Sequence, residues 1–481
     1  MKQIYIKDII EICNAKLLCG NSEETLTDVI RDTREIKQGD TYIGFKGEHS
    51  DGNLLYEEAL EKGAKICILQ ESSLLTNNQE TTNKEAELDL IKEKIEKKHN
   101  NASVILVKDT TKALQQIAEY KRNLYNIPVI GITGSVGKTS TKDIIASVMS
   151  KKFNVLKTLG NYNNQIGLPL TILRLKDENA IVVEMGMNMP NEISTLSKIA
   201  KPTVAVITNV GTAHIGNLGS RENILKAKLE ILDGLQKDGI LVINNDNDML
   251  HNWYISKAHT AHKIITFGME NKSDIMPYDV ELSENGSTYK IDLDGKTYNV
   301  HISVGGNHFV LNSLCAIAIG RIFNIKTEDI LSGIANFELT KRRMQVEKNA
   351  NNITIINDCY NANYDSMKAA LEYLGEIKAK RKIAVLGDML ELGNFSKELH
   401  EKVGEEVAKN NIDMLVVVGE EAKHIVSKAL EKGLDNNRIY ICKNNEEAIK
   451  IIKKISKPED AILLKASNAM NFQEIFNSII N

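Results

Sequence analysis

The sequence contains no apolar run that approaches the roughly 18 residues of a membrane-spanning helix. Its first residues, MKQIYIKDIIEI, alternate charged side chains with isoleucine, unlike the uninterrupted apolar core of a secretory signal peptide. These two absences predict a soluble, cytoplasmic protein that does not use a membrane as a partner.

Cysteine is scarce, and charge of one sign is not in excess. The six cysteines form no CxxC pair and have no histidine at zinc-ligand spacing, which favours reduced core or surface thiols. The formal net charge is −4, so the chain has no general basic field and nucleic acid is not an expected partner.

What the sequence does contain is the composition of an ordinary globular protein, at 42% hydrophobic and 26% charged residues. A chain of 481 residues is too long for one hydrophobic core and predicts about three domains of ~150 residues. We expect an N-terminal unit over 1–127, a central unit over 128–338 and a C-terminal unit over 339–481, each of α/β type, without internal sequence repeats.

One stretch, Pro128–Asp143, has the order of a phosphate-binding loop. Val129–Thr133 is apolar and predicts a buried strand, a glycine-rich turn follows, and a helical pattern starts at Lys138. Backbone N–H groups in such a turn, together with the positive end of the helix dipole, suit a phosphate chain. The spacing from Gly134 to Gly137 is shorter than in the usual P-loop, so this loop is a variant.

This loop predicts a site for ATP or GTP with Mg²⁺. Lys138 would reach the β- and γ-phosphates, and the Thr139 hydroxyl would ligate the metal ion. The alternative is a chance GKT after an apolar run. Two more polar residues follow predicted strands of the central unit, Glu184 after Ala180–Val183 and His214 beyond Val204–Thr208. Ligands of open α/β sheets bind at the carboxyl ends of the strands, so a Mg²⁺ ion bridging carboxylate, imidazole and phosphate is the favoured interpretation.

Lys228 occupies an unusual position in the predicted helix Ser220–Leu235. It lies in the middle of the apolar face formed by Ile224, Ala227 and Ile231, whereas Lys226 lies on the opposite face. Burial would lower the pKa of its amine, and a neutral amine can react with CO₂ to give an anionic, metal-binding carbamate. The alternative is a lysine that extends its ammonium group to water past apolar neighbours, and the pattern alone favours that alternative.

The N-terminal unit predicts a helix over Ile4–Leu18, a strand over Thr41–Phe45 and a helix over Leu54–Lys62, with further strands at Lys65–Leu69 and Val104–Val107. The charged segment Glu71–Asn101 is interpreted as an exposed, partly flexible insertion with a helical patch near Leu88–Ile95. Arg34 and Lys46, each beside a tight turn, would grip a phosphate or diphosphate, or are solvated surface cations.

The C-terminal unit repeats a pattern of a buried strand followed by a polar turn. The predicted strands are Asn352–Asn357, Lys382–Leu386, Met414–Val418 and Ala461–Leu464. Arg342 and Arg343, at the junction with the central unit, either reach back to the nucleotide or belong to a charged linker.

Taken in order, the motifs resemble those of the Mur ligases of peptidoglycan synthesis over nearly the whole chain. They are DTR with GDTYIGFKG, GITGSVGKTSTKD, GNYNNQIGLPLTIL, VVEMGM, TNVGTAHIGNLGS, KAKLEIL, GGNHFVLN, KRRMQ, NDCYNANYDSM and GDMLELG. The YNAN and GDMLELG segments are typical of the member that adds D-alanyl-D-alanine to UDP-N-acetylmuramoyl-tripeptide.

The resemblance implies an N-terminal UDP-binding domain, a central ATPase domain and a C-terminal Rossmann-like domain in a monomer. The implied reaction is ATP-dependent peptide-bond formation through an acyl-phosphate, with UDP-N-acetylmuramoyl-tripeptide and D-alanyl-D-alanine as small-molecule substrates. It also implies a carbamate on Lys228, which reverses the preference stated above.

The resemblance assigns roles residue by residue. The implied catalytic residues are Lys138, Glu184, His214, Lys228 and Arg343, and the implied metal ligands are Thr139, Glu184, His214 and the Lys228 carbamate. The implied ATP contacts are Gly134, Ser135, Gly137, Lys138, Thr139, Ser140, His308, Asn312, Arg343 and Asp358. The implied substrate contacts are Thr33, Arg34, Lys46, Gly47, Asn163, Asn164, Tyr360 and Asn361.

The chain departs from the family pattern at three places outside the phosphate and metal positions. Tyr364 replaces a proline, Phe309 replaces an asparagine, and Lys465–Asn468 reads KASN where KGSR is common. Three other functions are weighed against this one: another amide ligase of the superfamily (one that adds the third peptide residue, or a folylpolyglutamate-type enzyme), a P-loop kinase, and a nucleotide-binding regulatory protein. The folylpolyglutamate type usually carries DGAHNP where this chain has NDCYNAN.

Overall fold

The protein is described from a computed structural model, which covers residues 2–75, 84–256, 260–283 and 286–480. It consists of β-sheets and helices that alternate along the chain, which confirms the predicted α/β class. By its internal contacts the chain divides into two compact units. Unit 1 comprises Met1–Val129, Leu156–Met185 and Thr195–Lys201, and unit 2 comprises Ile130–Val155, Gly186–Ser194 and Pro202–Asn481.

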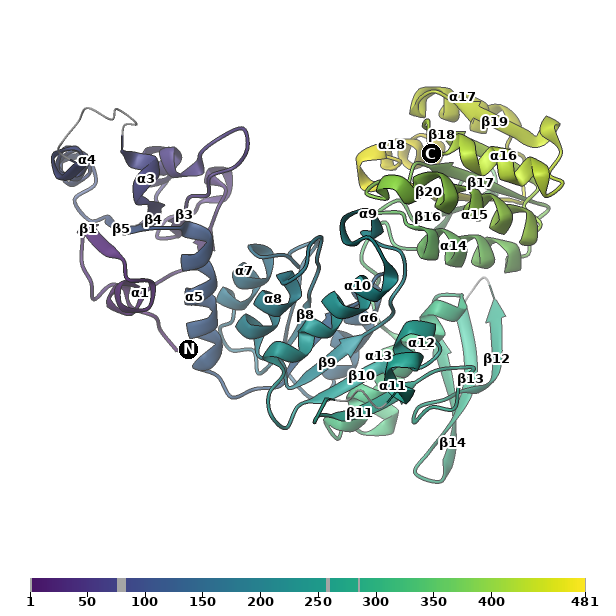
Figure 1. The fold of residues 1–481 in the computed structure, drawn as a ribbon, viewed down its shortest axis with the longest axis horizontal. Helices are drawn as coiled ribbons and strands as arrows, with labels where there is room; N and C mark the ends of the chain where they lie inside the picture. The colour runs from purple at the N-terminus through teal and green to yellow at the C-terminus, as the bar shows by residue number, and fades with distance from the viewer. Residues whose placement is uncertain (1, 76–83, 257–259, 284–285, 481) are drawn as a thin grey trace. The chain divides into compact units, whose positions relative to one another are not determined.

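The N-terminal part is a five-stranded sheet with the order β1-β5-β4-β3-β2 (Figure 1). Strands β2 to β5 pair in parallel and β1 is antiparallel to β5. Its strands are β1 (Lys16–Cys19), β2 (Val29–Ile30), β3 (Thr41–Ile43), β4 (Ile66–Gln70) and β5 (Ser103–Val107). Its helices are α1 (Ile6–Cys13), α2 (Tyr56–Glu61), α3 (Glu71–Leu74), α4 (Lys84–Lys98) and α5 (Thr110–Asn123), with 3₁₀ turns at Thr33–Glu35 and Gly52–Leu55.

Two predictions for this part were wrong. The helix predicted over Ile4–Leu18 ends at Cys13, because Asn14 adopts a left-handed conformation and the following residues form β1. The segment Glu71–Asn101 is not simply an exposed insertion, since α4 buries Leu88 and Ile95 in the core of this part. The two apolar residues are seven apart, two helical turns, so they lie on one face of an otherwise charged helix. Residues 76–83 of the segment lie outside the described residues.

The central six-stranded sheet has the order β11-β10-β9-β6-β8-β7. Its strands are β6 (Val129–Thr133), β7 (Val155–Lys157), β8 (Ala180–Glu184), β9 (Val204–Ile207), β10 (Ile240–Asn244) and β11 (Lys263–Phe267). Its helices are α6 (Lys138–Met149), α7 (Gly167–Leu173), α8 (Glu192–Ala200), α9 (Ile215–Leu218), α10 (Arg221–Leu229), which continues as a 3₁₀ turn over Glu230–Gly234, and α11 (Asp248–Ile255). Strand β9 pairs in parallel with both β6 and β10, as expected for a sheet of continuous apolar runs. The predicted strands of this part begin at the observed residues.

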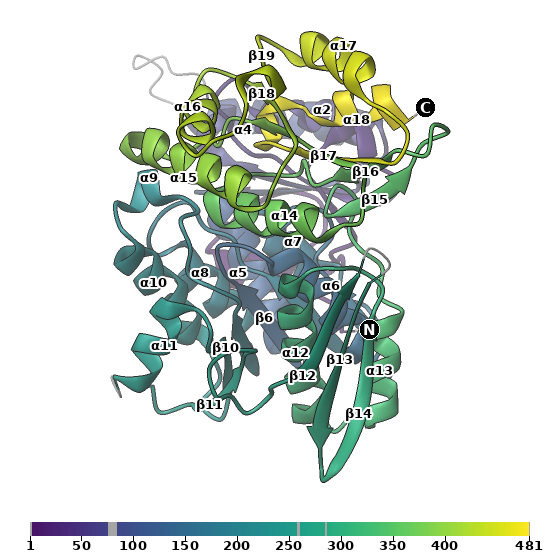
Figure 2. The ribbon, with the colours of Figure 1, turned by 90° about the vertical axis from the view of Figure 1, so that its right-hand side faces the viewer.

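A three-stranded antiparallel sheet in the central part was not predicted. It consists of β12 (Tyr278–Ser283), β13 (Gly286–Leu293) and β14 (Lys296–Ile302). Figure 2 shows it beside the helices α12 (Asn307–Ile322) and α13 (Thr327–Ala335). Tyr289 of β13 is buried against α12, where its hydroxyl lies 2.8 Å from the Ser313 hydroxyl.

The C-terminal part is a doubly wound sheet with the order β15-β16-β20-β17-β18-β19, parallel except for the β15–β16 pair. Its strands are β15 (Gln345–Lys348), β16 (Thr354–Asn357), β17 (Arg381–Gly387), β18 (Met414–Val418), β19 (Ile439–Cys442) and β20 (Asp460–Lys465). Its helices are α14 (Tyr364–Glu376), α15 (Ser396–Lys409), α16 (Lys423–Glu431), α17 (Asn445–Ile455) and α18 (Gln473–Ile480), with 3₁₀ turns at Gly393–Phe395, Asn436–Arg438 and Asn468–Met470. Helices α14 and α15 cover one face and α17 and α18 the other (Figure 1).

The ends of the four strands predicted here, β16, β17, β18 and β20, were correct to within two residues, whereas β15 and β19 were not predicted. Across the described residues, no helix combines the length and the apolar character that a membrane crossing requires.

Candidate active site

The predicted phosphate loop joins β6 to α6, both in unit 2 apart from Val129. Gly134 has φ +152°, and a Cβ atom there would lie 1.9 Å from the Thr208 hydroxyl at the end of β9. The loop therefore requires glycine at this position because the neighbouring strand end leaves no room for a side chain. Gly137 is left-handed and directly precedes the first helical residue, Lys138.

Asn209 holds this loop from the end of β9, a role that the sequence analysis missed. Its side-chain oxygen accepts hydrogen bonds from the backbone N–H groups of Ser135 (3.0 Å) and Val136 (2.9 Å). The Ser135 hydroxyl in turn accepts a bond from the Gly211 N–H (2.9 Å). Two of the loop's N–H groups are thus bound within the protein.

Lys138, His214 and Lys228 lie close enough together to affect one another's protonation. Lys228 is 1% exposed, and burial followed by repulsion from Lys138 holds its pKa well below the ordinary lysine value. The alternative of a lysine reaching water is therefore wrong. Burial also lowers the pKa of His214, with Lys138 and Lys228 adding to the effect and Glu391 opposing it.

Glu391 is a further residue near the site that the sequence did not single out. It belongs to the GDMLELG segment of the C-terminal part and has a left-handed backbone, with φ +63°. Its carboxylate oxygen lies 2.8 Å from His214 Nδ1. In the sequence Glu391 is only an acid between Leu390 and Leu392. Its left-handed backbone and its contact with His214 are visible only in the structure.

Arg343 connects the C-terminal part to the phosphate loop. Its guanidinium group stacks on the ring of Tyr360 at 3.9 Å, and its Nη2 atom lies 3.4 Å from the Thr139 hydroxyl. Arg342 instead donates to the Cys359 carbonyl (3.0 Å) and to Asn468 (2.9 Å) within the C-terminal part. Of the two arginines at the junction, Arg343 alone contacts the phosphate loop in the described residues.

Asp358 is 8% exposed and lies inside the C-terminal part rather than at an open surface. Its carboxylate forms a buried ion pair with Lys465 and accepts the Met344 N–H at 3.1 Å. Lys465 also donates to the Asn361 carbonyl at 3.1 Å. The buried lysine thus holds the turn that carries Tyr360 and Asn361.

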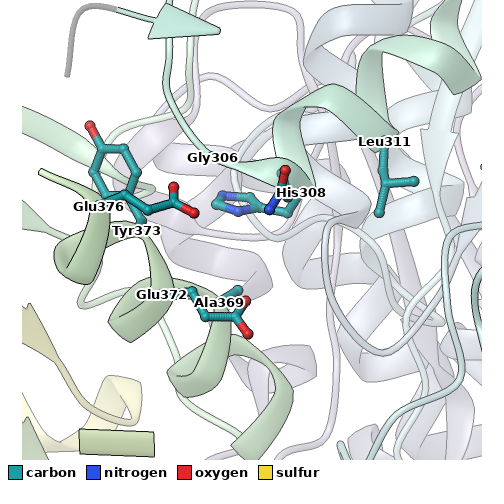
Figure 3. Close-up of a pocket in the computed structure, with 8 residues that line it drawn as sticks. Gly306, His308, Leu311, Ala369, Glu372, Tyr373 and Glu376 are labelled. Carbon is teal, nitrogen blue, oxygen red and sulfur yellow. The ribbon is translucent and has the colours of Figure 1, made fainter. Parts of the chain in front are cut away.

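A cavity of about 160 Å³ lies between the first turns of α12 and the helix α14 (Figure 3). The ring of His308 projects into it from α12, and Glu372, Tyr373 and Glu376 line it from α14. Burial lowers the pKa of His308 to about 4, so its imidazole is neutral at pH 7. Burial raises the pKa of both glutamates.

Asn312, one turn along α12 from His308, faces the phosphate loop. Its side-chain oxygen accepts a bond from the Thr141 hydroxyl at 3.0 Å. Its amide nitrogen is buried and has no hydrogen-bond partner within the described part of the chain. A buried unpaired donor beside a phosphate loop is a position where a ligand atom would satisfy it.

In unit 1, Glu184 stands at the end of β8 and is 1% exposed. Its N–H donates to the Thr158 hydroxyl at 3.1 Å, and Asn163 Nδ2 lies 3.5 Å from its carboxylate. The oxygen of Asn164 accepts the N–H groups of Ile166 and Gly167 and so shapes the start of α7. Of the two predicted substrate asparagines, Asn163 is near the acid and Asn164 has a local structural role.

Of the predicted diphosphate residues of unit 1, Arg34, Lys46 and Gly47 are exposed and Thr33 is buried. Arg34 is 83% exposed and forms a paired contact with Asp32, and this hydrogen bonding holds the pKa of that carboxyl well below its usual range. Thr33 is buried and donates to Glu58 at 2.9 Å. Lys46 and Gly47 open a tight turn closed by the bond from the Gly47 N–H to the Ser50 carbonyl (2.8 Å).

Within unit 2 the structure brings together Lys138, Thr139, His214, Lys228 and Arg343. Glu184, Asn163 and the diphosphate residues belong to unit 1. No group of three or more histidine, cysteine or acidic side chains in the described ranges could hold a metal ion by itself.

Comparison with known proteins decides the family. Family models match three successive segments: a Mur ligase family catalytic domain over 27–122, a Mur ligase middle domain over 132–320, and a Mur ligase glutamate ligase domain over 342–468. The UDP-N-acetylmuramoyl-tripeptide–D-alanyl-D-alanine ligase of Bacillus subtilis is 36% identical over 99% of this chain and 98% of its own length. The protein of that name from Escherichia coli is 30% identical over 89% of this chain and 88% of its own length.

The chain belongs to the Mur ligase family.

Solved structures agree with this membership. MurF from Acinetobacter baumannii has a TM-score of 0.86 at 26% identity and covers 100% of this chain and 99% of that chain. The MurF ligase from Thermotoga maritima in complex with ADP has a TM-score of 0.77 at 28% identity, with coverage of 94% and 96%. The three-domain α/β architecture of the Mur ligases is therefore the architecture of this chain. The domain boundaries at 127/128 and 338/339 stay predictions.

The Mur ligase site contains three contacts that motif reading did not supply: Asn209 under the phosphate loop, Glu391 at His214, and the Arg343–Tyr360 stack. In each case a motif residue from one segment meets a residue from a segment more than ten positions away. The sequence contains both residues of each pair but does not show that they meet. Only the Arg343–Tyr360 contact had a sequence signal, because arginine often stacks on tyrosine and the two residues lie in neighbouring motifs.

Proposed function

We propose that this chain is an ATP-dependent ligase that joins D-alanyl-D-alanine to UDP-N-acetylmuramoyl-tripeptide and releases ADP and phosphate. The observation that carries the proposal is the match to a relative of that name over 99% of this chain and 98% of the relative. Lys138 and Arg343 beside the phosphate loop support the same chemistry. The reaction begins when the tripeptide carboxylate approaches the γ-phosphate of ATP, and positive charge reduces the repulsion between these two anions.

The phosphate loop of this chain suits the triphosphate of ATP. Gly134, Ser135, Gly137 and Ser140 supply a narrow loop and a helix start, and Lys138 supplies the positive charge. Lys138 now contacts the Gly134 carbonyl at 2.7 Å, within the loop that the phosphates would enter. We assign the adenine end to His308 and Asn312, since the 160 Å³ cavity and the unpaired Asn312 amide lie on that side.

The residues present also fit a magnesium ion held jointly with ATP. Mg²⁺ commonly takes one or two protein ligands together with substrate phosphates and water, which agrees with the lack of a ready-made acidic cluster in the described residues. We assign Thr139 and Glu184 as ligands of this ion, and His214 with a carbamate on Lys228 as ligands of a second ion. When bound, the ion would neutralise charge on the phosphates. The buried, low-pKa amine of Lys228 is the form that reacts with CO₂.

In the first step an oxygen of the tripeptide's terminal carboxylate attacks the γ-phosphorus of ATP, the bond to the β-phosphate oxygen breaks, and ADP leaves. Lys138 and Arg343 face the negative charge that this step concentrates, and Tyr360 keeps the Arg343 guanidinium in place. In the second step the amine of D-alanyl-D-alanine attacks the acyl carbon, a tetrahedral intermediate forms and loses phosphate, and the amine releases its proton.

Recognition of the nucleotide-sugar substrate is assigned chiefly to residues at turns of the N-terminal part. Thr33, Arg34, Lys46 and Gly47 would bind the uridine diphosphate, and Asn163 and Asn164 would lie beside the acceptor carboxylate. Tyr360 and Asn361 complete the assigned substrate contacts, and Asp358 the ATP contacts. We propose that the enzyme works as a monomer in the cytoplasm, where its nucleotide substrates are found.

The test is phosphate release from ATP with UDP-N-acetylmuramoyl-tripeptide, with and without D-alanyl-D-alanine, with the UDP product followed by mass spectrometry. The proposal requires release that depends on both substrates and a product heavier by the dipeptide. Turnover with a different amine would assign the chain to another reaction of the superfamily, such as a folylpolyglutamate-type ligation. ATP binding without turnover on any acceptor would favour a regulatory protein.

A further inference from the structure

The loop over 209–214, which carries His214, is held by the C-terminal part at a residue that no motif assignment uses. Asp365 lies in the first turn of α14, and one of its carboxylate oxygens accepts two hydrogen bonds from Thr212. The backbone N–H of Thr212 lies at 2.7 Å and its hydroxyl at 2.9 Å from that oxygen. Because both donors bind the same carboxylate oxygen, they form a short, directional contact between the central part and the C-terminal part, at residues that both belong to unit 2.

Gly211 provides the space for this carboxylate. A Cβ atom at Gly211 would lie 2.2 Å from one Asp365 oxygen and 2.5 Å from the carboxyl carbon. The backbone of Gly211 is outside the left-handed region, so other residues could adopt its conformation. Glycine is needed here because of the neighbouring aspartate and not because of its own φ angle.

Asp365 is not required to cap its own helix. Asn363 is the N-cap of α14, and its side chain accepts the Ser366 N–H at 2.9 Å while the Ser366 hydroxyl accepts the Asn363 N–H at 3.1 Å. An acid in the first turn of a helix also interacts favourably with the helix dipole, but that interaction needs no contact with Thr212. The orientation of the Asp365 carboxylate toward Thr212 therefore serves the contact between parts.

The same loop is contacted a second time by the C-terminal part, through Glu391 at His214 (2.8 Å). The two contacts are two residues apart on the loop and come from different segments, the start of α14 and the turn after β17. Such a pair fixes the 212–214 end of the loop at two points on the C-terminal part, while the Val210 and Gly211 N–H groups bind Asn247 and Ser135 of the central part.

We propose that Asp365 is a positioning residue, which ties the C-terminal part to the loop that carries His214, with Gly211 as the space that admits it. This inference rests on the proposed function for the role of His214. Loss of the contact changes turnover, because His214 and the C-terminal residues lose their mutual placement. It leaves the phosphate loop, and with it ATP binding, in place, because the bonds from Asn209 and between the Gly211 N–H and the Ser135 hydroxyl hold that end of the 209–214 loop within the central part.

The decisive experiment is a double-mutant cycle with Asp365→Ala, Gly211→Ala and the double variant, measured by steady-state ligase kinetics. We expect Asp365→Ala to lower kcat about tenfold, the scale of a lost charge-assisted hydrogen bond, with the KM for ATP within about twofold of the parent. Gly211→Ala displaces the carboxylate and lowers kcat at least as much. The double variant should be no slower than Asp365→Ala, since the clash disappears with the carboxylate.

Multiplicative losses in the double variant would overturn the proposal, as would a rise in the KM for ATP with unchanged kcat. Asp329→Ala is the matched control, because it removes an acid from the first turn of another helix, α13, in the same unit. Asp365→Asn keeps an oxygen that accepts both bonds and should retain more activity than Asp365→Ala. Thr212→Ser should be nearly normal, whereas Thr212→Val loses the hydroxyl donor and should be slower.

A second readout separates this proposal from the proposed function. Amide hydrogen exchange of a peptide spanning 209–214 should be faster in Asp365→Ala than in the parent and in Asp329→Ala, with thermal unfolding checking that each variant folds. If the parent has no ligase activity but this difference is found, the proposed function fails and the contact stands. If the parent is active and exchange is unchanged, the positioning role of Asp365 is wrong.

Discussion

Two groups of basic side chains in this protein are arranged in opposite ways. Around the phosphate loop, Lys228 is almost completely buried and Arg343 is stacked on Tyr360. At the N-terminal turn, Arg34 is 83% exposed and paired with Asp32. The first group places an amine in the protein interior and a guanidinium group on an aromatic ring, whereas the second keeps a guanidinium group in water beside a carboxylate.

The difference agrees with the roles proposed for the two groups. A charge held in a low-dielectric site acts strongly on a reacting phosphate and needs no rearrangement when the reaction occurs. An exposed ion pair contributes little stability, so its exchange for a substrate phosphate costs little. We therefore expect substitutions in the first group to change kcat and substitutions in the second to change KM.

The largest effect should come from Lys138→Ala. Loss of the loop's ammonium group should lower kcat about a thousandfold while the fold remains, because this charge faces the transferring phosphoryl group. Steady-state phosphate release measures the loss, and circular dichroism checks the fold. Lys151→Ala, just beyond the far end of α6, is the matched control and should be close to normal. A normal rate in Lys138→Ala would exclude the phosphate-loop assignment.

Lys228→Ala should lower kcat about a hundredfold by removing the site of the proposed carbamate. Short carboxylic acids added to the assay should restore part of the activity, because they supply an anion in the space left by the side chain. Lys226→Ala, two residues away and exposed, is the control. Full activity in Lys228→Ala would contradict the carbamate. So would an equal rise in the activity of Lys226→Ala when the same acids are added.

Arg34→Ala tests the other side of the comparison. We expect the KM for the UDP substrate to rise about tenfold with little change in kcat, since the residue would bind a part of the substrate that does not react. Lys7→Ala, which removes another exposed, ion-paired cation of the same part, should leave both constants unchanged. A fall in kcat without a change in KM would place Arg34 in the reaction itself.

The smallest effect concerns pH. The pKa of His308 is about 4 in the folded protein and about 6.5 when unfolded, so the unfolded chain binds more protons between these values. The free energy of unfolding should therefore fall as pH decreases from 6.5 to 4, with a contribution of at most about 1.4 kcal/mol per pH unit. His308→Gln should reduce this slope in urea unfolding measured at several pH values.

Asp32 provides the opposite case for the same measurement. Its folded pKa lies below the ordinary value, so its contribution is present at pH values above about 4 and is lost only at more acidic pH. Asp32→Asn should leave the slope between pH 6.5 and 4 unchanged. An equal change of slope in both variants would contradict the assignment of that slope to His308.

Much of this fold could be predicted because apolar runs and glycine turns are local signals. The strand Val129–Thr133 and the helix start at Lys138 were predicted at the observed residues, and the apolar face around Lys228 is buried as its spacing indicated. The helix predicted to continue to Leu18 failed because the pairing of β1 with β5 outweighs the helical spacing of that segment.

By itself the sequence determined the α/β class, the order of strand, glycine turn and helix in the phosphate loop and, through ordered motifs, the family, whereas the burial of Lys228 was decided by the structure. Only the tertiary structure decided which residues meet: Arg343 with Tyr360, Glu391 with His214, and Asp365 with Thr212 across Gly211. The physical reason is the sequence separation over which each effect acts. Periodicity and turn propensity act over a few residues, whereas these contacts join segments up to about 180 positions apart, and such pairings arise from packing of the whole chain.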